Sequence, residues 1–136
     1  MIKRILIFDD DKTILKILKY ILEVEGWEVL NSLDSNNVIE QVSCFKPSII
    51  MMDNNIPDCG GIVATQSIKL NKEFQHIPVI FFTASNDIKE LCQKAGADAY
   101  LAKPFDLTRL FEVIKQISSP KHTPSETFAF VENSAQ

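Results

Sequence analysis

The chain has 136 residues, of which 46% are hydrophobic and 24% are charged, and its formal net charge at pH 7 is −4. These proportions are typical of a globular protein with one hydrophobic core, and they exclude a disordered chain. No apolar run approaches the roughly 18 residues that cross a bilayer. The acidic balance argues against nonspecific nucleic-acid binding.

The N-terminus and the cysteines indicate a cytoplasmic location. Met1–Arg4 leads into a short strand-like run and lacks the long apolar region and cleavage site of a signal peptide. Cys44, Cys59 and Cys92 are widely spaced and include no CxxC pair. We therefore interpret them as small apolar residues of a reducing compartment.

The first part of the chain alternates between a strand pattern and a helix pattern. The unbroken apolar run at 5–8 predicts a strand that is buried on both faces. A helix follows from residue 12, capped by Asp11 and closed by Gly26. Its expected buried face consists of Ile14, Ile17, Leu18, Ile21 and Leu22. A second strand is expected around 27–30.

The middle of the chain repeats this alternation. After the polar residues 32–37, a helix is expected that stops before Pro47 and buries Val38, Ile39, Val42 and Phe45. The apolar run at 48–53 predicts a strand that ends in Asp53. Residues 54–61 hold a proline, an aspartate and two glycines, a composition typical of a loop.

The last part adds three helices and two strands. Helices are expected at about 61–71, from Asn86 or Asp87 to Gly96, and from Asp106 or Thr108 onward. Strands are expected at 78–82 and 97–102. The last helix should bury Leu107, Leu110, Phe111, Ile114 and Ile117. We expect one domain over 1–118 and a flexible tail over 119–136, with docking of Phe128, Phe130 and Val131 as an alternative.

Five strands that alternate with five helices predict a parallel α/β sheet with right-handed crossovers. Ligands of such a sheet bind beyond the carboxyl ends of its strands. The polar residues at those ends are Asp9, Asp10, Asp11, Asp53, Thr83 and Lys103. Four of the five strand ends thus supply a carboxylate, a hydroxyl or an ammonium group to one edge of the sheet.

This set of side chains is suited to phosphoryl transfer onto Asp53. Neighbouring carboxylates repel one another unless a cation is bound, and ligands that are all oxygen favour Mg²⁺ over Zn²⁺. Lys103 would supply a charge for an anion and Thr83 a hydroxyl donor. A carboxylate is an established nucleophile for this chemistry. Asp11 is more simply interpreted as a helix cap.

The sequence from about Lys3 to Ile117 resembles the receiver domain of two-component response regulators. The matching segments are Phe8–Asp10, Met52–Asp53, Phe82–Ala84 and Tyr100–Phe105, together with Pro57, Gly61 and Gly96–Asp98. The resemblance implies a flavodoxin-like three-layer fold whose five-stranded parallel sheet has the order 2-1-3-4-5. It also implies a signalling switch, not an enzyme in the ordinary sense.

The resemblance implies a role for each site residue. Asp53 would accept a phosphoryl group from a histidine kinase or a phosphotransfer protein. Asp9, Asp10, Asp53 and the main-chain carbonyl of Asn55 would hold Mg²⁺. Lys103 would pair with the phosphate, and the Lys103–Pro104 bond would be cis.

Further implications concern the switch itself. Thr83 would move to hydrogen-bond the phosphate, and Tyr100 would change rotamer. These movements would alter the face made by the fourth helix, the fifth strand and the fifth helix. The polarity of Asn54, Asn55 and Ser85 predicts a phosphorylated state of modest lifetime.

Two other functions stay open at this point: a Mg²⁺-dependent phosphatase or hydrolase on the same fold, and a pseudo-receiver that works without phosphorylation. We expect a stand-alone receiver that presents 86–94 and 106–115 to a downstream protein. A receiver cut from a longer regulator is the alternative. The chain would be a monomer or a phosphorylation-dependent dimer, with no direct contact to nucleic acid or membrane.

Overall fold

The computed structural model describes residues 3–118, and the expected tail at 119–136 lies outside the described residues. The described strands and helices alternate strictly. They are β1 (Arg4–Phe8), α1 (Lys12–Val24), β2 (Glu28–Ser32), α2 (Val38–Phe45), β3 (Ile49–Asp53), α3 (Gly60–Leu70), β4 (Val79–Thr83), α4 (Ile88–Ala95), β5 (Ala99–Ala102) and α5 (Leu107–Ile117).

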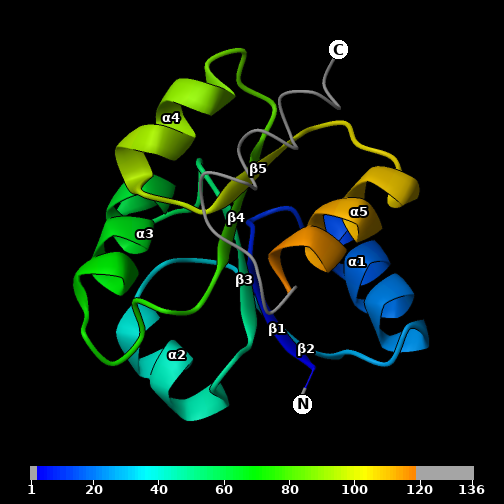
Figure 1. Cartoon of the computed structure of the whole chain (residues 1–136), viewed down its shortest axis with the longest axis horizontal. Coiled ribbons are helices and arrows are strands. Elements are labelled where there is room, and N and C mark those ends of the chain that lie inside the picture. Colours follow the sequence, from blue (N-terminus) through cyan, green and yellow to red (C-terminus); the bar gives the residue numbers. More distant parts are fainter. Residues whose placement is uncertain (1–2, 119–136) are drawn as a thin grey trace.

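The five strands form one parallel sheet in the order β2-β1-β3-β4-β5, which confirms the predicted topology. α1 and α5 cover one face, and α2, α3 and α4 cover the other (Figure 1). The strands are level at their carboxyl ends, because Phe8 pairs with Met52, Asp53 with Phe82, and Thr83 with Ala102. This register brings the turns that follow β1, β3, β4 and β5 to one edge.

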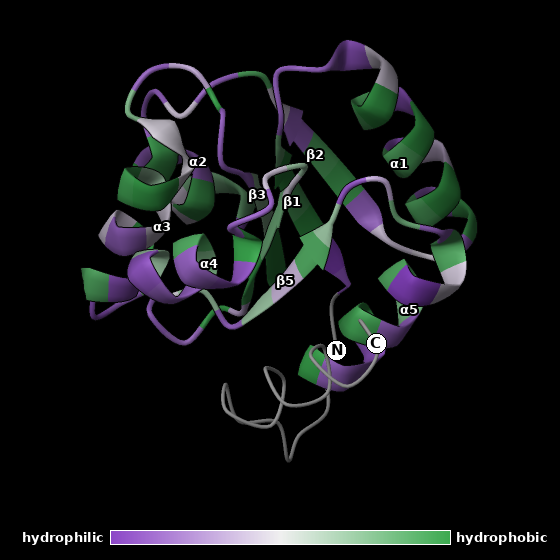
Figure 2. Cartoon of the chain, turned by 90° about the horizontal axis from the view of Figure 1, so that it is seen from above, coloured by the Kyte–Doolittle hydropathy of each residue, from purple (hydrophilic) through white to green (hydrophobic). Residues whose placement is uncertain are grey.

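The core lies on both sides of the central strands. Every residue of β3 and β4 is buried, and so are the last four residues of β1. Figure 2 shows these mostly hydrophobic strands between two layers of helices. Helices on both faces explain why the strand sequences are unbroken apolar runs instead of alternating polar and apolar residues.

Two predicted helix faces were partly wrong. Ile17 of α1 is 52% exposed and Leu107 of α5 is 46% exposed, although both were expected to be buried. Leu15 and Val113 are buried instead. Both helices carry apolar residues on more than one face, so helical spacing alone could not select the face that meets the sheet.

Helix starts were predicted more accurately. The Asp11 carboxylate accepts hydrogen bonds from the amides of Thr13 and Ile14, which confirms it as the cap of α1. Of the two expected starts of α5, Asp106 is the cap, and its carboxylate accepts from the amide of Arg109. None of the helices in the described part of the chain is long and apolar enough to span a membrane.

Candidate functional site

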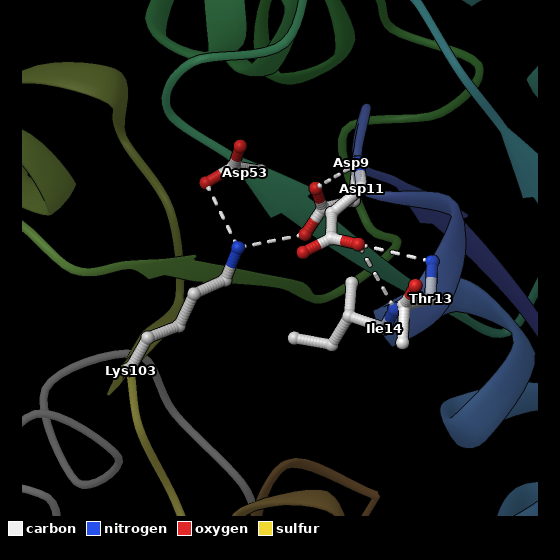
Figure 3. Close-up of polar contacts among 6 residues, drawn as sticks. All are labelled: Asp9, Asp11, Thr13, Ile14, Asp53 and Lys103. Carbon is white, nitrogen blue, oxygen red and sulfur yellow. Dashed lines mark hydrogen bonds and ion pairs between the residues drawn. The ribbon is translucent and has the colours of Figure 1, made fainter.

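Three carboxylates and one ammonium group meet at the carboxyl edge of the sheet. Asp9 and Asp10 directly follow β1, Asp53 ends β3, and Lys103 directly follows β5. Lys103 Nζ lies 2.7 Å from Asp9 Oδ2 and 3.5 Å from Asp53 Oδ1, so it bridges the two carboxylates (Figure 3). The sequence therefore predicted correctly that these residues lie together.

The depth of these side chains differs. Asp9 and Asp53 are buried, with 1% and 4% of their surfaces exposed, whereas Asp10 is exposed. One oxygen from each of the three carboxylates lies within 4.8 Å of the others. The site thus has a buried floor made by two strand ends and an open side at Asp10.

The electrostatics of the site follow from this geometry. Burial is the main reason why the pKa of Asp53 is raised above its ordinary value, and the nearby Asp9 and Asp10 carboxylates raise this pKa further. The charge and hydrogen bond of Lys103 act in the opposite direction. Three carboxylates face a single ammonium group, so the site carries an excess of negative charge when all of them are ionised.

Asp11 does not belong to the carboxylate cluster, although it contacts one of its members. Its side chain caps α1, while its own amide donates a hydrogen bond of 2.9 Å to Asp9 Oδ1 (Figure 3). The tight turn after β1 therefore uses both oxygens of Asp9, one for the Asp11 amide and one for Lys103. This arrangement fixes the orientation of the Asp9 carboxylate.

The first turn of α3 approaches Asp53 through Gly61. A Cβ atom on residue 61 would lie only 2.3 Å from the Asp53 carbonyl oxygen and 2.8 Å from Asn54 Cα. The Gly61 amide donates a 3.0 Å hydrogen bond to the Asn54 carbonyl. Only glycine allows this close approach of α3 to the residue that ends β3.

Thr83 and Tyr100 lie on the neighbouring strands β4 and β5, Thr83 at the carboxyl edge and Tyr100 two residues before the end of its strand. Thr83 ends β4 and is 1% exposed, and its hydroxyl has no hydrogen-bond partner among the described residues. Its carbonyl accepts a 2.9 Å hydrogen bond from the Lys103 amide, which joins the two strand ends. Tyr100 lies on β5 opposite Phe81 and is buried. A buried hydroxyl without a partner is uncommon in native structures and calls for an explanation.

The remaining predicted residues lie in the loops around the site. Asn55 is exposed in the loop after β3, two residues beyond Asp53. Ser85 follows β4, and its hydroxyl accepts a 3.2 Å hydrogen bond from the Asp87 amide. The Lys103–Pro104 peptide bond is cis.

The sequence did not predict the aromatic contact of Lys103. Lys103 Nζ lies 4.7 Å from the centre of the Phe82 ring, and Phe105 packs edge-on against Phe82 with ring centres 6.4 Å apart. Phe82 has the sequence pattern of an ordinary buried strand residue. Its contact with Lys103 joins two distant segments of the chain, and such a contact leaves no pattern in the local sequence. This cation–π contact helps to hold the ammonium group in place.

The carboxylate cluster fits a divalent cation with oxygen ligands. No histidine or thiolate belongs to the cluster, which favours Mg²⁺ over transition metals. Magnesium binds one or two carboxylates and usually keeps several waters. The open side at Asp10 leaves room for those waters.

Known proteins resemble this chain over the same region. Residues 5–115 match the family described as the response regulator receiver domain. The polar-differentiation response regulator DivK of Brucella ovis is 29% identical over 117 residues, which cover 85% of this chain and 95% of that protein. A CheY-like receiver domain protein from Methanospirillum hungatei has a TM-score of 0.75 and 32% identity, covering 85% of this chain and 92% of its own.

A second similar structure contains a metal. The receiver domain of a sensor histidine kinase from Pseudomonas aeruginosa, with a magnesium ion coordinated in its active-site cleft, has a TM-score of 0.78 and 27% identity. The match covers 88% of this chain and all of that domain (100%). With a family match across most of the sheet and helices, this chain belongs to the response regulator receiver domain family.

Proposed function

We propose that this chain is a phosphorylation-dependent signalling switch. Asp53 accepts a phosphoryl group from a histidine kinase or a histidine phosphotransfer protein. The observation that carries this proposal is the Lys103 ammonium group between Asp9 and Asp53, at the edge where the strand ends meet. The cytoplasmic location expected from the sequence belongs to the same proposal.

In the transfer, an Asp53 carboxylate oxygen forms a bond to phosphorus while the bond from phosphorus to the donor imidazole nitrogen breaks. The nitrogen keeps the electron pair of the broken bond. Lys103 supports the attack in two ways, because it opposes the rise in the pKa of Asp53 and can pair with a phosphoryl oxygen.

Magnesium is the cofactor that we propose for this step. Asp9, Asp10, Asp53 and the main-chain carbonyl of Asn55 would hold it. When bound, it supplies positive charge that offsets the carboxylates and the phosphoryl oxygens. The three carboxylates within 4.8 Å of one another support this assignment.

The switch would start at Thr83. A phosphoryl group adds up to two negative charges and three strong acceptors, and the Thr83 hydroxyl has no partner among the described residues. We propose that this hydroxyl moves to the phosphate and that Tyr100 on β5 changes rotamer with it. Phosphorylation would then shift the balance between two arrangements of the α4–β5–α5 surface, to which a downstream protein binds.

Intact-mass measurement after incubation with acetyl phosphate and Mg²⁺ tests the proposal. We expect one added phosphoryl group, lost on Asp53→Asn or on chelation of the metal. Asp58→Asn is the matched control, because Asp58 is an exposed carboxylate in the next loop and asparagine tolerates its φ of 85°. Continuous phosphate release without a captured adduct would instead indicate a hydrolase, and the absence of any reaction a pseudo-receiver.

A further inference from the structure

The loop after β2 is hydrogen-bonded to the loop after β3 through one buried serine. Ser35 is 2% exposed, and its amide and hydroxyl both donate to the Pro57 carbonyl, at 3.0 and 2.8 Å. The same hydroxyl accepts a 3.0 Å hydrogen bond from the Cys59 amide. The Cys59 sulfur lies 3.1 Å from it. Ser35 thus contacts both sides of the turn at 57–59.

A hydroxyl group is required for these contacts. It must donate to a carbonyl and accept from an amide at the same time, which alanine cannot do and a thiol does weakly. The serine is itself held firmly by its neighbours. The Asp34 carboxylate accepts from the Asn36 amide at 3.0 Å, and the Ser32 hydroxyl donates to the Asp34 carbonyl at 2.9 Å. These two hydrogen bonds restrict the backbone of the loop on both sides of Ser35.

The segment that Ser35 holds includes Asn55. At its start, the Asn54 carbonyl accepts a hydrogen bond from the amide of Gly61, which lies in the first turn of α3 and packs against Asp53. In its middle, Ile56 is buried, with 2% of its surface exposed. Beyond Ile56, the loop is fixed to the rest of the fold by the Ser35 hydrogen bonds to the turn at 57–59. The backbone of Asn55 therefore lies between one anchor on β3 and another on Ser35.

We propose that Ser35 is a positioning residue for the divalent-cation site. By fixing the turn at 57–59, it restricts the backbone of Asn55, whose main-chain carbonyl is one of the proposed metal ligands. Ser35 can have this role only if the proposed function is correct. Residues that orient metal ligands contribute to affinity without touching the ion, and their loss typically weakens binding by about 10–100-fold.

Magnesium titration of Ser35→Ala tests the proposal. We expect the affinity for Mg²⁺ to fall about tenfold, the lower end of the range for such residues. Phosphorylation by acetyl phosphate should slow at low Mg²⁺ and return to within about twofold of the unsubstituted rate at saturating Mg²⁺, since the carboxylates are intact. Cys59→Ala is the matched control, because it removes the sulfur beside Ser35 and keeps the amide that Ser35 binds.

Amide hydrogen exchange without metal measures the loop contact separately. In Ser35→Ala the Cys59 amide should exchange faster, because its acceptor is gone. Unchanged exchange, or faster exchange with unchanged Mg²⁺ affinity, would overturn the positioning role. If Ser35→Ala does not fold, Ser35→Cys should weaken Mg²⁺ binding in the same direction.

The unsubstituted protein separates the two proposals. If it neither binds Mg²⁺ nor accepts a phosphoryl group, the proposed function fails and the role of Ser35 fails with it. If it does both and Ser35→Ala matches it at every Mg²⁺ concentration, only the role of Ser35 is wrong.

Discussion

Two lysine–aspartate groups lie at opposite edges of the sheet. In one of them the positive and negative charges are equal in number, and in the other they are not. At the start of β4 and β5, Lys69 Nζ contacts Asp98 Oδ2 at 2.6 Å and donates to the carbonyls of Ile77 and Gln75 at 2.7 and 3.2 Å. Asp98 also accepts from the Val79 amide at 2.8 Å. One positive charge therefore meets one negative charge, and the ammonium group uses all three of its donors.

The group at the other edge differs in each of these respects. Lys103 meets Asp9 and Asp53, with Asp10 beside them, so negative charge is in excess. The nearby Thr83 hydroxyl is buried without a partner among the described residues. An ion pair is thus no sign of a functional site by itself. The unbalanced charge and the unpaired hydroxyl distinguish the edge where we propose that ligands bind from the edge where Lys69 joins α3 to the sheet.

The largest expected effect comes from removing each lysine in turn. In EDTA, Lys69→Met and Lys103→Met should each lower the free energy of unfolding by about 3 kcal/mol, because each leaves a buried carboxylate without its cation. Mg²⁺ should restore much of the stability of Lys103→Met and none of that of Lys69→Met. Urea unfolding with and without Mg²⁺ measures both variants.

Lys72→Met is the control for this pair, because Lys72 is exposed and its loss should change stability by less than about 0.5 kcal/mol. If Mg²⁺ restored the stability of Lys69→Met and Lys103→Met equally, or of neither, the difference in charge balance between the two groups would not determine where the cation binds.

A smaller effect is expected from the aspartates, and it should have opposite signs at the two edges. At pH 7 in EDTA, Asp53→Asn should raise the free energy of unfolding by about 1 kcal/mol, a common size for one substitution. Asp98→Asn should lower it, because it leaves Lys69 without its partner. Chemical unfolding of the two variants against the unsubstituted chain gives both signs.

The pH dependence follows from the raised pKa of Asp53. The folded chain binds this proton more tightly than the unfolded chain, so ionised Asp53 costs stability above its folded pKa. As the pH falls through the raised pKa toward the ordinary value of 3.8, that cost disappears and the advantage of Asp53→Asn should shrink. An advantage that grows toward acid pH would contradict the sign of the shift.

The sequence predicted the group of side chains at the carboxyl edge of the sheet but not the Lys69–Asp98 pair at the opposite edge, and the reason is physical. Asp9, Asp53, Thr83 and Lys103 each follow a recognisable apolar run, and parallel strands must bring such positions together. No comparable rule joins Lys69, inside a helix, to Asp98, which lies 29 residues later in the chain. The strand order came from the family resemblance, because alternating strands and helices do not fix it.

Ser35 shows the same limit in a loop. It lies in a polar segment that composition identifies only as a loop, and nothing local marks its hydroxyl as the contact to Pro57 and Cys59. The exposed positions of Ile17 and Leu107 are a related case. Both line a cavity of about 380 Å³ beside Lys103, a place defined by the packing of α1 against the loop after β5. Helical spacing cannot show such packing between distant segments.

The smallest effect on stability is expected at Thr83, where the two edges differ most in hydrogen bonding. Thr83→Val keeps the shape of the side chain and removes a hydroxyl that has no partner among the described residues, so the free energy of unfolding should change by less than about 0.5 kcal/mol. Asp53 should still take up a phosphoryl group, but the Tyr100 ring signals in NMR spectra should respond less to beryllofluoride with Mg²⁺. Thr83→Ser, which keeps the hydroxyl, is the control. A large loss of stability in Thr83→Val would mean that the hydroxyl serves the resting fold, and an unchanged Tyr100 response would separate Thr83 from the switch.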